Sequence, residues 1–145
     1  MAATGLEVFD KTLQTTNIWL DEIMEDIGPD RQVAWHALGA VLRALRDRLP
    51  LELAVHLGAQ LPLRVRGAYY EQWHLGGHGA PPRKLDDFLE VVATNLQGTR
   101  PRNLEDVTQT VFRTLAGHVD AGQVRKVVDA LPVEIRRFWR GSGEV

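Results

Sequence analysis

Apolar residues recur at alternating spacings of three and four near the start of the chain. The series contains Leu6, Phe9, Leu13, Leu20, Ile23 and Ile27, with Thr16 as its one polar member. This spacing places the whole series on one face of a helix. Thr4 and Glu7 have the types and spacing of a capping box at the helix start. Gly28-Pro29-Asp30 indicates the end of this helix and caps the next one. The pattern therefore predicts a long amphipathic helix.

Shorter segments with helical spacing follow, and prolines separate several of them. Pro50, Pro62 and Pro132 stand where a helix can begin, because proline is tolerated in a first turn but not in a helix interior. The predicted helices cover about residues 31–49, 51–59, 62–73 and 85–96, followed by a helix capped by Asn103, a short helix around 124–128 and a last one from 132. The β-branched cluster within 124–128 is too short and isolated to build a sheet. We therefore predict an all-α fold.

The second half of the chain repeats the first. Residues 41–70 align without a gap on residues 111–140, at an offset of 70 positions. Matched identical residues include Leu61 with Leu131, Pro62 with Pro132 and Arg66 with Arg136. A repeat of this length indicates a duplicated architecture. We predict one helical domain over residues 1–145 with two tandem four-helix repeats, the first at about 17–73 and the second at about 83–140, joined by a linker at 74–82.

Composition excludes several classes of protein. The chain has 145 residues, of which 44% are apolar and 25% charged, and it contains no cysteine. These values are ordinary for one globular domain. The absence of cysteine excludes disulfides, thiolate metal sites and a cysteine nucleophile. The first residues do not have the pattern of a signal peptide, and no apolar run approaches the ~20 residues that cross a bilayer. We expect a cytoplasmic protein that makes no membrane contact.

Four short motifs, in this order and spacing, carry a resemblance to a bacterial family. They are DRLP at 47–50, AQLP at 59–62, RGAYYEQW at 66–73 and LPVEIRRFW at 131–139. Over about residues 17–140 the chain resembles the family named domain of unknown function 2267. The resemblance implies a duplicated helical domain with no assigned activity, and therefore no catalytic residue and no cofactor. Family members typically begin near the counterpart of Asn17, which makes residues 1–16 an extension.

Two histidines and a glutamate near the middle of the chain are the candidate metal ligands. His74 and His78 are four residues apart, and Glu71 precedes His74 by three. Di-iron bundles need such a Glu-x-x-His pattern on two helices, whereas here it occurs once. Because glycines separate the two histidines, we favour solvated loop side chains and no metal. The alternative is a ligand- or metal-binding protein, or an enzyme, that uses Glu71, His74, His78 and Tyr70.

Charge is distributed unevenly along the chain. Residues 1–30 hold seven carboxylates and one lysine, whereas residues 31–70 hold six arginines and two carboxylates. We expect the acidic first helix to lie near basic helices of its own domain. A further alternative is weak nucleic-acid binding through Arg43, Arg46, Arg64 and Arg66. We disfavour it because no alternation of aromatic and basic residues accompanies them.

The start of the first helix is the candidate contact with another protein. Leu6, Phe9 and Leu13 have no counterpart in the second half, where the matching region is the linker. Leaving such a stripe in water costs ~25 cal/mol per Å² of apolar surface. Glu7 and Asp10 beside it would form a polar rim, as interfaces usually have. We predict a homodimer or protein partner that contacts Leu6, Phe9 and Leu13, and we expect a non-enzymatic protein-interaction module.

Overall fold

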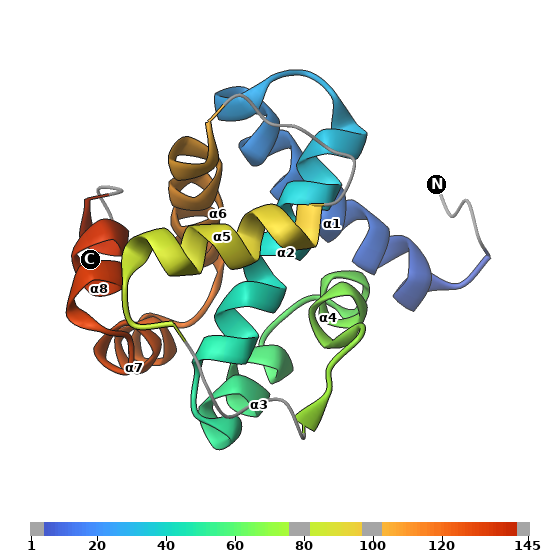
Figure 1. The fold of residues 1–145 in the computed structure, drawn as a ribbon. Helices are drawn as coiled ribbons and strands as arrows, with labels where there is room; N and C mark the ends of the chain where they lie inside the picture. The colour runs from blue at the N-terminus through green and yellow to red at the C-terminus, as the bar shows by residue number, and fades with distance from the viewer. Residues whose placement is uncertain (1–4, 76–81, 97–102, 142–145) are drawn as a thin grey trace.

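The computed structural model describes residues 5–75, 82–96 and 103–141, and this part of the chain is helical with no strand (Figure 1). The fold is therefore all-α, as the apolar spacing predicts. None of the described helices is both long enough and apolar enough to cross a bilayer. The helices are α1 (Glu7–Ile27), α2 (Arg31–Arg48), α3 (Leu51–Ala59), α4 (Leu63–Tyr70), α5 (Leu85–Leu96), α6 (Leu104–His118), α7 (Ala121–Asp129) and α8 (Val133–Arg140).

Polar side chains begin two of the long helices, at the positions marked in the sequence. The Asp30 carboxylate accepts hydrogen bonds from the backbone N–H groups two and three residues ahead, at 2.9 and 3.3 Å. The side-chain oxygen of Asn103 does the same at 2.9 and 3.1 Å. These bonds satisfy N–H groups that have no partner inside the helix. For α1, which begins at Glu7, Thr4 of the expected capping box lies outside the described residues.

The first helix of each half packs on the other half. α1 lies against α6 and α5 lies against α2, and these are the two most extensive helix contacts in the described residues. Figure 1 shows α5, in yellow, crossing in front of α2. α1 also contacts α2 and α4, just as α5 contacts α6 and α8, and α3 meets α7 between the halves. A single hydrophobic core results, and it contains buried residues from all eight of these helices.

The helix boundaries follow the offset of 70 residues that the sequence shows. α3 and α7 begin and end 70 residues apart, and so do α4 and α8. Leu61 and Leu131 precede the matched helices α4 and α8, and each is only 1% exposed. The spatial superposition of the two halves stays a prediction, and so do the boundaries at 17–73, 74–82 and 83–140, because residues 76–81 lie outside the described part.

The end of α4 corrects one expectation from the sequence. The predicted helix reaches residue 73, but α4 ends at Tyr70. Glu71 has extended backbone angles, and Gln72 has a φ of 59°, in the left-handed region. The physical reason lies in α2, where the Arg46 guanidinium donates hydrogen bonds to the carbonyls of Tyr69 and Glu71, both at 2.8 Å. The backbone at the end of α4 is therefore bound by a side chain of α2.

Carboxylates of α1 pair with basic groups of neighbouring helices, as the uneven charge predicts. One basic partner belongs to α2 and two belong to α6, so only one of the three lies in residues 31–70. Each pair is substantially exposed, and such pairs stabilise a fold little. The pairs are Arg31 with Asp21 at 3.0 Å, Arg113 with Asp26 at 2.6 Å and His118 with Glu22 at 2.7 Å.

Truncating either matched leucine should destabilise the protein. We expect Leu61→Ala and Leu131→Ala each to lower the free energy of unfolding by ~2–5 kcal/mol, because each removes a buried side chain and leaves a cavity. Denaturant unfolding monitored by circular dichroism measures the change. Leu63→Ala and Val133→Ala are matched controls two residues further on, since both side chains are 52% exposed. A loss at one leucine only would contradict equivalent core positions.

Candidate functional site

The start of α1 carries an exposed apolar stripe. Leu6, Phe9 and Leu13 are 52%, 47% and 41% exposed. From Thr16 onward, the same face of the helix is buried against the other helices. In Figure 1 the N-terminal end of α1 lies at the edge of the molecule. The stripe is therefore a continuation of the core-facing side of α1 beyond the core itself.

The second half has no equivalent of this projection. α1 has 21 residues and α5 has 12, and their ends correspond closely, so α1 starts nine residues earlier. These residues add about 14 Å of helix, at 1.5 Å per residue. Where α5 begins, the N–H of Leu85 donates to the Glu134 carboxylate at 2.9 Å. At the matched place in the first half, the N–H of Arg64 donates to the hydroxyl of Thr12 at 3.2 Å, and α1 continues past it.

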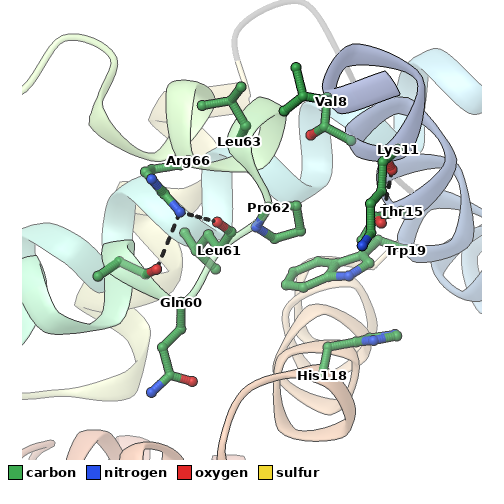
Figure 2. A pocket seen from close by; sticks show the side chains of 12 residues that line it. Val8, Lys11, Thr15, Trp19, Gln60, Leu61, Pro62, Leu63, Arg66 and His118 are labelled. Atoms are coloured by element: carbon green, nitrogen blue, oxygen red, sulfur yellow. Dashed lines mark hydrogen bonds between the residues drawn. The ribbon is translucent and has the colours of Figure 1, made fainter. Parts of the chain in front are cut away.

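A groove of about 410 Å³ runs beside the projecting part of α1 (Figure 2). One wall is α1, and the other is formed by the turn between α3 and α4 and by His118 at the end of α6. The Trp19 ring stacks on His118 with 5.0 Å between centroids. At the upper end of the view, Val8 and Leu63 add two exposed apolar side chains. The groove is lined by both polar and apolar residues, and Val8 and Leu63 add exposed apolar surface beside the start of α1 that carries Leu6, Phe9 and Leu13.

Arg66 lines this groove, but its role is structural. Its guanidinium donates to the carbonyls of Ala59 at 3.2 Å and Leu61 at 2.9 Å. The matched Arg136 makes the same two bonds in the second half, to the carbonyls of Asp129 and Leu131. Because both halves share the arrangement, we assign Arg66 to holding the turn before α4.

The other arginines of the nucleic-acid alternative are also held by the protein. Arg46 is 3% exposed and bonds the end of α4. Arg43 donates to the carbonyl of Ala68 at 3.3 Å. Arg64 is exposed, and its guanidinium carbon lies 5.7 Å from the centre of the Trp35 ring. Arg46 and Arg66 therefore bind carbonyl groups of the protein itself, whereas Arg64 is exposed. Nucleic-acid binding through the four arginines stays the disfavoured alternative.

Glu71 and His74, the candidate metal ligands in the described part of the chain, are not gathered into a site with other ligands. Because α4 ends at Tyr70, Glu71 and His74 do not share a helical turn, and both are exposed. His78 lies outside the described residues. Among residues 5–75, 82–96 and 103–141, no three side chains of histidine, aspartate or glutamate come together as a metal-binding group. The absence of metal binding at Glu71, His74 and His78 stays a prediction.

The aromatic residues at the end of α4 form a packed cluster. Tyr69 is buried, its hydroxyl donates to the carbonyl of Ala54 at 2.6 Å, and burial raises its pKa. Tyr70 stacks on Trp73 with 5.6 Å between ring centres. The Tyr70 hydroxyl donates to the carbonyl of Val55 at 3.3 Å. Tyr70, which the ligand-binding alternative uses, and its neighbour Tyr69 thus join α4 to α3.

Known proteins place the chain in a group without an assigned activity. A family model described as "Uncharacterized conserved protein (DUF2267)" matches residues 16–138. No curated protein matches the chain. The exposed stripe at Leu6, Phe9 and Leu13 precedes the first matched residue, in agreement with an extension at the N-terminal side of the family domain.

Removing the buried Arg46 guanidinium should be costly. The Arg46 guanidinium carbon also lies 5.4 Å from the centre of the Trp73 ring. We expect Arg46→Ala to lower the free energy of unfolding by about 2–4 kcal/mol, because two backbone carbonyls lose a charged donor and Trp73 loses this cation contact. Thermal and denaturant unfolding measure the loss. Arg125→Ala, at an exposed position of α7, is the control and should change stability little. Equal stability of the two variants would contradict the structural role of Arg46.

Zinc should not stabilise the protein. Because Glu71 and His74 are exposed and separated from other ligands, we expect added Zn²⁺ to leave Tm unchanged in the full chain and in His74→Ala. Differential scanning fluorimetry with and without a chelator measures it. A chelator-sensitive rise in Tm that disappears in His74→Ala would show binding to the folded state, and would support the metal-site alternative.

Proposed function

Because the chain belongs to the DUF2267 family, which has no assigned activity, we propose its function from the surface it presents: it is a non-enzymatic protein-interaction module. Its docking element is the start of α1, residues 7–15 together with Leu6. The observation that carries the proposal is the exposure of Leu6, Phe9 and Leu13 on the face of α1 that is core-facing further along.

The energetics of the stripe favour a partner. Exposed apolar surface costs ~25 cal/mol per Å², and a projecting amphipathic helix recovers this when its apolar face enters another surface. The adjoining groove, with Val8 and Leu63 at one end, widens the surface available to such a partner. Glu7 is exposed beside the stripe and supplies the polar edge that interfaces usually have.

A second copy of the chain is the partner we propose. In a two-fold dimer the same patch supplies both sides of the contact, so two stripes can cover each other without any other protein. Two helices that pack through such stripes approach within about 8–10 Å, which suits the leucine and phenylalanine side chains found here.

Charges placed in the stripe should dissociate the dimer. We expect the wild-type chain to sediment as a dimer and the double variant Phe9→Glu, Leu13→Glu as a monomer, because a dimer would bury four carboxylates without partners. Analytical ultracentrifugation over a range of concentrations measures this. Ile18→Glu is the matched control. Ile18 is 51% exposed, and it lies on the opposite side of α1 from Phe9, about two and a half turns away.

A chain shortened to begin at Thr16 completes the test. If the full and shortened chains sediment as the same species and melt alike, the start of α1 neither associates nor stabilises, and the proposal is wrong. If the Ile18→Glu control dissociates as readily as the double variant, the stripe is not the contact surface.

A further inference from the structure

A second groove, of about 430 Å³, lies between α2 and α4. Its volume is within the range of small-ligand sites, about 300–1,000 Å³. It is separate from the surface proposed for docking, since none of its lining residues belongs to α1. The residues that line it are Trp35, His36, Gly39 and Arg43 from α2, and Arg64, Gly67, Ala68 and Glu71 from α4 and its end.

Small residues keep this groove open, and their counterparts in the second half are large. At an offset of 70, Gly39 corresponds to Gln109 and Ala68 to Phe138. The Gln109 amide reaches from α6 to the carbonyl of Phe138, at 3.2 Å. The Gln109 amide nitrogen also lies 3.5 Å from the position that a Cβ atom on Gly141 would occupy. Gly141 is the counterpart of Glu71. The second half thus fills with Gln109 the space that the first half leaves open.

Gly39 leaves room for a guanidinium as well as for the groove. A Cβ at Gly39 would lie 2.8 Å from an Arg43 nitrogen, closer than such atoms approach. The same Arg43 nitrogen donates to the carbonyl of Ala68 at 3.3 Å, which matches the carbonyl that Gln109 bonds in the second half. Arg43 therefore lies along the groove because Gly39 has no side chain.

The positive charge of Arg43 is poorly neutralised. Its side chain is 16% exposed, and the nearest Glu71 oxygen is 4.0 Å away on a side chain that is 67% exposed. Burial lowers the pKa of Arg43, while Glu71 opposes that shift. The matched Arg113 has a close carboxylate partner instead, with 2.6 Å to Asp26. An anion in the groove would give Arg43 the close partner that Glu71 does not.

Arg64 adds a second cation to the groove, and its matched position in the second half carries a negative charge. The Arg64 guanidinium lies over the Trp35 ring, an arrangement that holds an otherwise mobile side chain at the groove. In the second half, Trp35, His36 and Arg64 are replaced by Glu105, Asp106 and Glu134. The groove of the first half is lined by two arginines and one carboxylate, that of Glu71. The matched positions of the second half hold two arginines, Arg113 and Arg137, and three carboxylates.

We propose that the groove between α2 and α4 binds a small organic or inorganic anion through a carboxylate or phosphate group. Arg43 and Arg64 hold the charge, since guanidinium groups form strong charge-assisted bonds with both kinds of oxyanion. Gly39, Gly67 and Ala68 provide the space, and Trp35 positions Arg64. The matched region of the second half, acidic and filled by Gln109, does not bind.

Titration by two-dimensional NMR tests the site, with inorganic phosphate and citrate as separate probes and sodium chloride at matched ionic strength as reference. We expect saturable shifts of the Gly39 and Gly67 amides and of the Trp35 indole N–H with at least one probe and not with chloride. A response to phosphate alone identifies a phosphate site, and a response to citrate alone a carboxylate site. No saturable shift with either probe would overturn the proposal.

Variants separate this site from a general effect of charge. Arg43→Gln and Arg64→Gln should each weaken binding about tenfold or more, because each removes a charge-assisted hydrogen bond. Gly39→Gln introduces the residue found in the second half and should abolish binding, and the three atoms nearest to its Cβ all belong to the flexible end of Arg43. Arg113→Gln removes the same charge at the matched position and should leave the dissociation constant unchanged. Equal weakening in Arg113→Gln, or full binding in Arg64→Gln and Gly39→Gln, would overturn the proposal.

Discussion

The crossed packing of α1 on α6 and of α5 on α2 is the constraint on which the rest of the structure depends. Neither half encloses its own core, because the first helix of each half covers the second helix of the other. The short helices α3, α4, α7 and α8 then close the remaining sides. This arrangement explains why one core contains buried residues from every described helix.

The same constraint decides where α1 leaves the core. The buried residues of α1 begin at Thr16, and the helices that contact α1 are α6, α2 and α4. A helix that continues by nine residues beyond its counterpart carries its apolar side into solvent. The stripe is thus exposed because α1 is longer than α5, and it has the same periodicity as the core-facing residues that follow it.

A comparison of matched positions in the two halves distinguishes residues that the fold requires in both halves from residues that differ between them. Arg66 and Arg136 make the same bonds to the turn before α4 and α8, so both are explained by the fold. Gly39 and Gln109 occupy matched positions with opposite effects on the space beside them. The proposed docking surface and the proposed anion site both lie where the halves differ. Both concern binding, in a family without an assigned activity.

The amino-acid sequence by itself determined the features that depend on neighbours along the chain. Helical periodicity identified the all-α fold, and the caps at Asp30 and Asn103 formed as expected because their partners are two and three residues away. The bounds of α3 and α5 also agree with the sequence pattern. The common face of Leu6, Phe9 and Leu13 follows from their spacing alone.

Tertiary structure decided what depends on residues far apart in the chain. α4 ends at Tyr70 and not at residue 73, and there a guanidinium from α2 binds the carbonyls of Tyr69 and Glu71. The exposure of the α1 stripe depends on where the other helices end, which no local pattern records. The groove beside Arg43 exists because packing brings Gly39 opposite Gly67 and Ala68, and a small residue leaves space only against a particular neighbour.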